Sequence, residues 1–298
     1  MLFTEPFAGP APVIRFINKA RGHLFMNCYY FNDFNPAIRA AVRRGVVVRV
    51  MVDPRPYRIS RRLVETEIAR LRRDGAHVVM PPARFTGAYR FDHAKYMVTN
   101  SAALVSTANF DWSAFHRNRE YIDITRNPAT VRVLDTVFNA DAGNRPAGLS
   151  CRQISQAALT VTPGPAGCSG RDILARLISR NDPVRVETEE LPDDSPVLGD
   201  LEHAGSRAEI VIPPPSRAGL AAVRRLRAAG VRLRVLPRRP LYMHAKMIEA
   251  GRLTWIGSNN LSPTSLTRNR EIGIFVESPG QRRALRSTFQ ADFQRAGE

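Results

Sequence analysis

The sequence has few cysteines and no long apolar run. Its 298 residues include three cysteines, Cys28, Cys151 and Cys168, which are too few for a disulfide-rich scaffold and show no zinc-site spacing. No stretch approaches the roughly 18 apolar residues of a membrane-spanning helix, and the first residues lack the features of a secretory signal. We therefore expect a soluble protein without a metal or other cofactor, either cytoplasmic or exported as a mature chain.

The cysteines nevertheless allow one disulfide bond. Cys28 lies in an apolar run and is expected to be a buried thiol. Cys151 and Cys168 flank a turn-rich stretch and could be bridged if the protein is exported.

Acidic residues and lysines are both scarce compared with arginine. The chain has 27 Asp and Glu against 44 Lys and Arg, a formal net charge of +17, while 44% of its residues are hydrophobic. This composition excludes a disordered basic tail and favours an anionic partner: nucleic acid, an acidic membrane surface or a phosphorylated substrate. Only three basic residues are lysines, so their positions are informative: Lys19, Lys95 and Lys246.

The chain contains an internal repeat. Three short matches share one offset of 151 positions: His93-Ala94-Lys95 with His244-Ala245-Lys246, Asn109 with Asn260, and Arg117-Asn118-Arg119-Glu120 with Arg268-Asn269-Arg270-Glu271. Because this offset is about half of the length, we predict two similar halves, residues 1–150 and 151–298.

Both halves alternate strand-like apolar runs with amphipathic helical segments, which predicts an α/β fold. The stretch 146–170 is rich in Gly, Pro, Ser and Thr and is expected to connect the halves. The predicted strands are 23–31, 46–52, 77–80, 184–187, 208–212 and 231–236. The predicted helices are 36–44, 61–73, 171–179, 196–204 and 220–229.

The repeated residues suit displacement at a phosphodiester. Residues i and i+2 of a strand face the same side, so each histidine projects together with the lysine that follows it. If the halves pack about a pseudo-twofold axis, one shared site would collect two imidazoles, two ammonium groups and two carboxamides: His93, Lys95, Asn109, His244, Lys246 and Asn260.

The chemistry of such a site needs two histidines with different roles. One neutral imidazole would attack phosphorus, while the other, protonated, donates to the leaving oxygen and later acts as a base. The lysines and asparagines would hold the phosphoryl oxygens. A compact ammonium beside such an oxygen is not replaced by a guanidinium, which fits two of the three lysines lying here.

Two acidic residues complete the repeat. Glu120 and Glu271 lie at equal spacing from their respective histidines, and a carboxylate that accepts the other imidazole N–H would fix its orientation. We expect each glutamate to orient the histidine of its own half. The alternative is a surface ion pair with the adjacent Arg119 or Arg270.

These residues resemble the duplicated HKD motifs of the phospholipase D superfamily, HxKxxxxD followed by a GSxN-like segment. The first copy combines His93 and Lys95 with Ser106-Thr107-Ala108-Asn109. The second combines His244 and Lys246 with Gly257-Ser258-Asn259-Asn260. The Asp position holds Asn100 in the first copy and Gly251 in the second, and we expect these departures to alter turns more than activity.

The resemblance covers both halves and implies a fold and an assignment of roles. The fold is a pair of pseudo-twofold-related αβαβα sandwich halves with the active site at their interface, in a monomer that forms an internal pseudo-dimer. The family pattern also implies that His93 is the nucleophile and His244 the acid, in a reaction that needs no metal.

The resemblance leaves three functions open. We expect a phosphodiesterase that hydrolyses or transfers phospholipid head groups, with peripheral membrane contact. A nuclease acting on DNA or RNA is the alternative, motivated by the net charge and by residues 211–247, which contain eight arginines and no acid. A non-catalytic protein that binds nucleic acid or membrane is the third. Aromatic residues beside the motifs are either core or a lip for lipid or bases: Phe85, Tyr89, Phe91, Phe110, Trp112, Phe115 and Tyr242.

Overall fold

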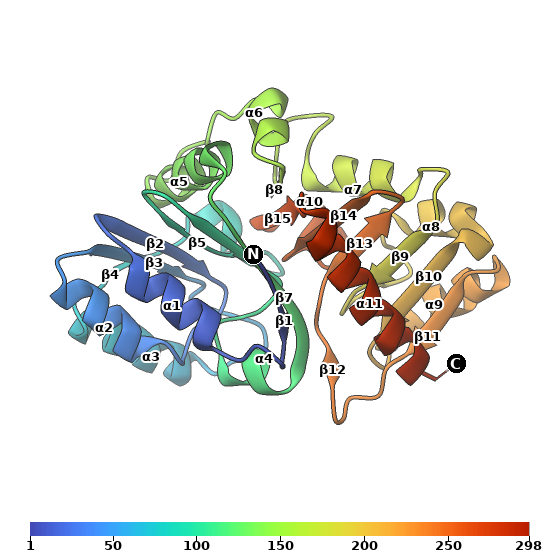
Figure 1. The fold of residues 1–298 in the computed structure, drawn as a ribbon, viewed down its shortest axis with the longest axis horizontal. Coiled ribbons are helices and arrows are strands. Elements are labelled where there is room, and N and C mark those ends of the chain that lie inside the picture. Colours follow the sequence, from blue (N-terminus) through green and yellow to red (C-terminus); the bar gives the residue numbers. More distant parts are fainter. Residues whose placement is uncertain (298) are drawn as a thin grey trace.

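Two mixed β-sheets, one in each half of the chain, form the framework of the molecule (Figure 1). The computed structural model describes residues 1–297. The strand order of the first sheet is β1 (Leu2–Glu5), β7 (Asn118–Thr125), β6 (Ala103–Ser106), β5 (Lys95–Thr99), β2 (His23–Cys28), β3 (Val47–Val52) and β4 (His77–Val79). The order of the second is β8 (Leu159–Thr162), β15 (Glu271–Phe275), β14 (Leu253–Gly257), β13 (Met247–Ala250), β9 (Val184–Glu187), β10 (Ala208–Ile212) and β11 (Arg232–Val235).

The two sheets have the same topology. In each, three parallel strands at one edge are followed by antiparallel strands, and β5 and β13 occupy the same place next to β2 and β9. The duplication and the α/β class predicted from the sequence are therefore confirmed.

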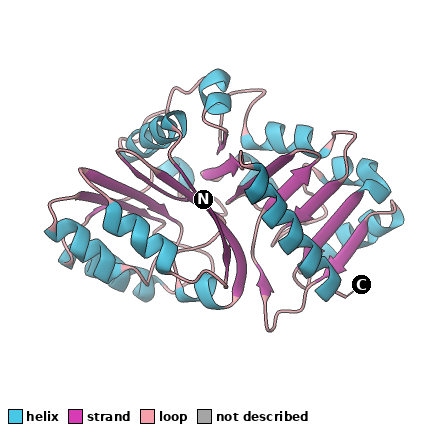
Figure 2. Ribbon diagram, in the orientation of Figure 1, coloured by secondary structure: helices cyan, strands magenta, loops and turns pink. Residues whose placement is uncertain are grey.

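Helices cover both faces of each sheet (Figure 2). Along β2, Leu24 and Met26 face one helical layer, while Phe25 between them stacks on Phe138 of α5 (Pro128–Ala142), as the two-residue period of a strand requires. No helix of residues 1–297 is both long and apolar enough to cross a bilayer. The helices are α1 (Ala11–Lys19), α2 (Asn35–Arg43), α3 (Arg61–Arg73), α4 (Trp112–His116), α5 (Pro128–Ala142), α6 (Cys151–Gln156), α7 (Gly170–Ile178), α8 (Leu198–Ala204), α9 (Gly219–Ala228), α10 (Pro263–Thr267) and α11 (Pro279–Arg295).

The stretch 146–170, expected to connect the halves, contains regular structure. Helix α6 begins with a capping box, in which Ser150 and Gln153 satisfy each other's backbone N–H groups. Strand β8 then adds to the edge of the second sheet beside β15. Its apolar side chains Leu159 and Val161 are buried against the core between the halves, and this burial stabilises a strand in a turn-rich segment.

A short segment of each half pairs with the other half, at the repeated Arg-Asn-Arg-Glu residues. Strand β12 (Tyr242–Met243) pairs in parallel with Asn118 and Arg119 at the start of β7. In the same way, Asp92 of the first half pairs with Arg270 of the second. The backbone N–H of His93 donates to the Arg270 carbonyl at 2.9 Å. The segment that leads into each histidine is thus aligned by the opposite half.

Two buried ion pairs also join the halves. Nε of Arg119 lies 2.5 Å from Asp292 of α11, and Nε of Arg270 lies 2.7 Å from Asp141 of α5. All four side chains are almost completely inaccessible to solvent. The alternative expectation, that these arginines form surface pairs with the adjacent glutamates, is therefore wrong.

The two positions at which the chain departs from the HKD pattern lie in turns. Asn100 follows β5, and its Oδ1 accepts the backbone N–H of His23 at 3.0 Å. Gly251 lies between β13 and β14 with φ +59°, and a Cβ there would come within 2.7 Å of the Asp182 carboxylate. Both turns lie at the opposite end of their strands from the repeated lysines, as expected for changes that alter turns.

Cys151 and Cys168 form the disulfide bond that the sequence allowed, and we expect this bond to contribute to stability. The double variant Cys151→Ser/Cys168→Ser should lose about 3 kcal/mol of free energy of unfolding, because the bond closes a loop of moderate length. Denaturant unfolding measures this loss. Reductant should destabilise the wild type by a similar amount and leave the double variant unchanged, because Cys28 is buried and unpaired. A double variant as stable as the wild type would contradict the prediction.

Removal of one partner of a buried ion pair should be costly. In Asp292→Ala the Arg119 guanidinium keeps its hydrogen bond to the Glu5 carbonyl but loses both bonds to the carboxylate. We expect a loss of about 3–5 kcal/mol of free energy of unfolding. The matched control is Glu65→Ala, which removes the exposed pair with Arg61 and should cost less than about 1 kcal/mol. Similar losses in both variants would disprove the special role of the buried pair.

Candidate active site

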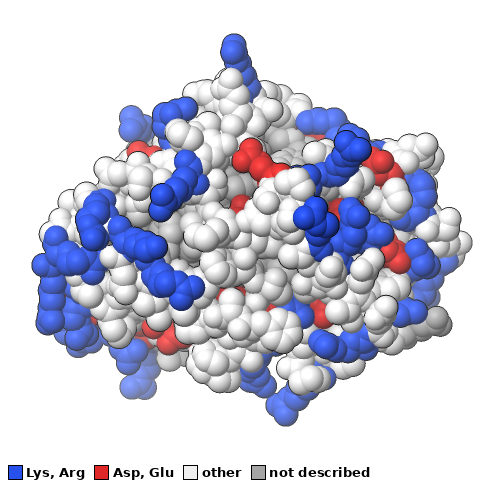
Figure 3. Space-filling model, in the orientation of Figure 1, with Lys and Arg blue, Asp and Glu red and all other residues white. Residues whose placement is uncertain are grey.

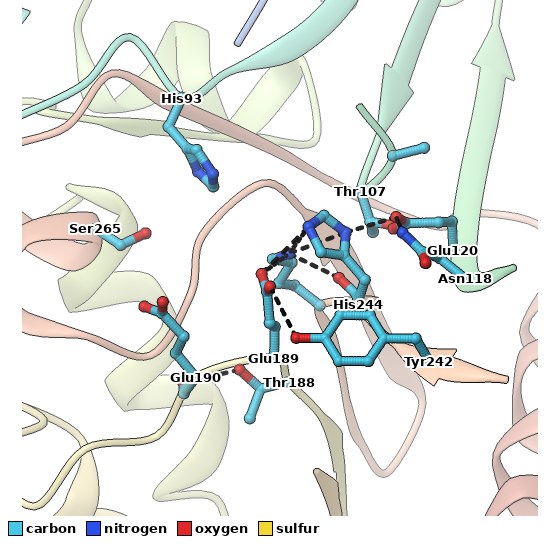
Figure 4. A network of polar contacts seen from close by, with 12 residues as sticks. His93, Thr107, Asn118, Glu120, Thr188, Glu189, Glu190, Tyr242, His244 and Ser265 are labelled. Carbon is cyan, nitrogen blue, oxygen red and sulfur yellow. Dashed lines mark hydrogen bonds and ion pairs between the residues drawn. The ribbon is translucent and has the colours of Figure 1, made fainter. Parts of the chain in front are cut away.

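The repeated histidines lie between the halves, and each is paired with a glutamate of the opposite half. Nδ1 of His93 is 3.0 Å from the Glu271 carboxylate, and Nδ1 of His244 is 2.5 Å from that of Glu120. All four side chains are buried. Figure 4 shows both imidazoles turned toward one common space. The expectation that each glutamate orients the histidine of its own half is wrong.

The physical reason is the register of the exchanged segments. Met243 lies opposite Arg119, so the next residue of the segment, His244, meets the next residue of the strand, Glu120. Asp92 lies opposite Arg270 in the same way, which brings His93 to Glu271. Backbone pairing between the halves therefore builds both histidine–glutamate pairs.

Hydroxyl and amide groups hold the two carboxylates in place. Glu120 accepts from Thr107 Oγ1 at 2.6 Å and from Asn118 Nδ2 at 3.4 Å. Glu271 accepts from Ser265 Oγ at 2.6 Å and from Asn269 Nδ2 at 3.2 Å. Thr107, Asn118 and Ser265 can be followed in Figure 4. The two asparagines are part of the repeat, so their shared position was visible in the sequence even though their role was not.

The two lysines lie beside the histidines. Lys95 Nζ donates to the backbone carbonyl of His93 at 2.6 Å, and Lys246 Nζ donates to that of His244 at 2.7 Å. Both side chains are buried, and burial lowers the pKa of Lys95 to about 7. A lysine ammonium has three N–H donors. Lys95 therefore has donors to offer to an anionic ligand beyond the one used by the carbonyl, whereas Lys246 gives a second one to Glu189 at 3.0 Å.

The two asparagines of the repeat follow β6 and β14. The side-chain oxygens of Asn109 and Asn260 are buried and accept no hydrogen bond from residues 1–297. An amide oxygen can only accept, so a phosphoryl oxygen could be held by the Nδ2–H donors of these carboxamides and not by the unpaired oxygens. The structure thus brings together six residues of the predicted site: His93, Lys95, Glu120, His244, Lys246 and Glu271. Asn109 and Asn260 follow the strands next to those that the lysines precede or begin, and their participation in the site stays a prediction.

Burial sets the protonation state of the first histidine. It lowers the pKa of His93 to about 4, although Glu271 pulls in the opposite direction. Burial would also raise the pKa of Glu271, but the contact with His93 holds it below its ordinary value. At neutral pH a neutral His93 therefore donates Nδ1–H to an ionised Glu271, and the lone pair is on Nε2.

The second histidine contacts an additional carboxylate. Glu189 Oε2 is 3.2 Å from Nε2 of His244 and 3.0 Å from Nζ of Lys246. Its Oε1 accepts a hydrogen bond from the Tyr242 hydroxyl at 3.3 Å (Figure 4). Sequence reasoning missed Glu189, because the segment that carries it does not follow the offset of 151 positions.

The aromatic residues near the motifs have different environments. Phe85, Phe110 and Phe115 are buried core, whereas Tyr89 and Trp112 are 77% and 51% exposed. The interpretation of these residues as ordinary core thus holds for the first three, and the two exposed side chains remain available for an interface.

The arginine-rich stretch 211–247 lies largely at the far edge of the second sheet. Arg225 pairs with Glu202, and Arg232 pairs with Glu209. Figure 3 shows the face of the molecule that is turned to the viewer in Figure 1. The basic side chains on this face lie mostly toward its rim, and its middle is largely uncharged. Arg225 and Arg232 are the two arginines of the stretch that form ion pairs with carboxylates among the described residues, and the other six keep their charge uncompensated.

Comparison with known proteins identifies the family of the chain. The family model described as "Cardiolipin synthase, PLD-like domain" matches residues 13–142 and 174–295. A comparison of the sequence with curated proteins gives no significant match.

Two solved structures share the fold over nearly the whole chain. Phosphatidylserine synthase from Haemophilus influenzae Rd KW20 is 14% identical with a TM-score of 0.72, and the match covers 99% of this chain and 86% of that one. Polyphosphate kinase from Porphyromonas gingivalis is 17% identical with a TM-score of 0.72 over 97% of this chain, which spans 46% of that protein. With the family match on both halves and the duplicated fold, the chain belongs to the phospholipase D superfamily, in its family of cardiolipin synthase-type PLD-like domains.

Proposed function

We propose that this protein is a phospholipase D-type phosphodiesterase that hydrolyses or transfers phospholipid head groups through a phosphohistidine intermediate. The observation that carries this proposal is the pair of buried histidine–glutamate contacts, each made between the two halves. The two imidazoles face one space (Figure 4), and a lysine lies beside each histidine. Two independently oriented imidazoles are what a double displacement at phosphorus requires.

In the first step Nε2 of His93 attacks phosphorus. The Nδ1–H of His93 donates to Glu271, which stabilises the positive charge that develops on the ring. The P–O bond to the leaving group breaks, and Nε2–H of His244 donates its proton to the leaving oxygen. Lys95, Lys246 and the two asparagines of the repeat would hold the non-bridging oxygens as charge builds up on them.

In the second step the phosphohistidine is resolved. Nε2 of His244, now without its proton, accepts a proton from water or an alcohol as that oxygen attacks phosphorus. The P–N bond to His93 breaks and the starting state returns. These residues can supply nucleophile, acid, base and charge stabilisation, so we expect the reaction to proceed without a divalent metal.

The assignment of roles rests on the unequal surroundings of the two histidines. Burial keeps His93 neutral at neutral pH, as a nucleophile must be. His244 has a carboxylate at each ring nitrogen, Glu120 and Glu189, so a protonated ring can donate at both ends. These contacts favour His93 as the nucleophile and His244 as the acid.

A phospholipid is the favoured substrate class. The match to a cardiolipin synthase-type domain over both halves and the exposed Tyr89 and Trp112 near the motifs support action at a lipid interface, where exposed aromatic rings are common. A nuclease is the second candidate, and the formal charge of +17 favours it.

Substrate class and metal dependence can be tested together. Wild type and His93→Ala are incubated with EDTA and with phosphatidylcholine, phosphatidylglycerol, single-stranded DNA or double-stranded DNA. We expect the wild type to release or exchange head groups and to leave DNA intact, and we expect His93→Ala to be at least about 10³-fold slower.

Other outcomes of this assay identify the alternatives. Cleavage of DNA alone would establish the nuclease, and no product from any substrate would favour a non-catalytic binding protein. Loss of activity in EDTA would contradict the metal-free mechanism.

The two glutamates should differ in their dependence on the leaving group. A p-nitrophenyl phosphodiester needs little proton donation, because p-nitrophenolate leaves unaided. We expect Glu120→Gln, which disturbs the acid His244, to lose about 10²-fold in kcat/KM with an alkoxide leaving group and much less with p-nitrophenolate. Glu271→Gln, which disturbs the nucleophile His93, should lose similar factors with both. The reverse pattern would exchange the roles of the two histidines.

A further inference from the structure

Glu189 places a negative charge inside a site that otherwise suits an anion. Its Oε2 contacts Nζ of Lys246 at 3.0 Å and Nε2 of His244 at 3.2 Å. The proposed function gives both of these groups to the oxygens of the phosphodiester. Burial alone would raise the pKa of Glu189, but the positive charges of His244 and Lys246 hold it well below its ordinary value, so the carboxylate is ionised.

The first half has no such carboxylate. Tyr96 pairs with Asn27 in the first sheet, and Met247, its counterpart in the repeat, pairs with Glu187 in the second. Counting two residues onward, Tyr29 corresponds to Glu189. The Tyr29 ring packs edge-on against His93 at 4.5 Å and lies 4.8 Å from Nζ of Lys95. An aromatic ring thus contacts one histidine–lysine pair, and a carboxylate contacts the other.

The contacts of Glu189 allow its carboxylate to be displaced. Its side chain is 21% exposed, and the carboxylate is held by Lys246, His244 and the Tyr242 hydroxyl. It lies just beyond the carboxyl end of β9, and no backbone group within residues 1–297 binds its oxygens. A rotation of this side chain would therefore leave the second histidine–lysine pair open to a ligand.

We propose that Glu189 is an internal competitor for the phosphate position, so that the site discriminates against phosphomonoesters in favour of phosphodiesters. This inference rests on the proposed function. A phosphodiester is a monoanion and replaces one negative charge by another when it displaces the carboxylate. A phosphomonoester or inorganic phosphate carries nearly two charges at neutral pH and meets stronger repulsion from the displaced carboxylate. The same repulsion would help expel the monoester produced by hydrolysis.

Binding of small anions tests this role without any turnover. Inorganic phosphate, mainly a dianion at about pH 8, and dimethyl phosphate, a monoanion, are titrated by calorimetry into wild type, Glu189→Gln and Glu190→Gln. Glu190 is the matched control, because it is the next residue, is exposed and points away from His244 in Figure 4. Thermal unfolding of each variant checks that it is folded.

We expect Glu189→Gln to bind inorganic phosphate at least about tenfold more tightly than the wild type, because a like charge is removed from the site. The gain for dimethyl phosphate should be smaller, and Glu190→Gln, which removes the same charge from a residue that bonds to neither Lys246 nor His244, should gain clearly less than Glu189→Gln for both anions. Equal phosphate affinity in wild type and Glu189→Gln, or equal gains for the two anions, would overturn the role of Glu189 alone. Absence of binding in all three folded proteins would instead remove the phosphate site and the proposed function with it.

Discussion

Backbone pairing across the interface is the constraint on which the site depends. A short segment of each half aligns with the repeat-bearing strand of the other, as Met243 does with Arg119. The following histidine then meets the following glutamate. Neither half contains a complete histidine–glutamate pair, so the duplication is a requirement of the site. The buried pairs that Arg119 and Arg270 form with Asp292 and Asp141 stabilise the same junction, one residue before each glutamate.

The two halves share one geometry but differ in electrostatics. Each histidine has one carboxylate at Nδ1 and a lysine bound to its own backbone carbonyl. The halves differ in charge beside the histidines, where Tyr29 contacts His93 and Glu189, at the corresponding position, contacts His244. A double displacement needs unlike histidines, and this difference supplies them. Glu189 contacts His244 and thereby makes it unlike His93, and it also contacts Lys246 and thereby affects the affinity of the site for anions. The choice of nucleophile and the anion affinity thus depend on the same residue.

The sequence allowed much of the fold and the composition of the site to be predicted. A constant offset reveals the histidines, lysines, asparagines and glutamates, and it also relates Asp141 to Asp292, a match that could have exposed the buried ion pairs. The direction of pairing could not be read in this way, because identical motifs look the same whether Glu120 bonds to the histidine of its own half or to that of the other. Glu189 gives no repeat signal, since its counterpart is a tyrosine.

The central claim is that this composite site makes His93 the nucleophile. The most direct test is to mix the wild type with excess substrate, quench the reaction at high pH within the first turnover, and locate phosphorus by mass spectrometry of the peptides. The account predicts a phosphorylated histidine at His93, which is absent from His93→Ala. Phosphate on His244, or a wild type that turns over without any phosphopeptide, would contradict it.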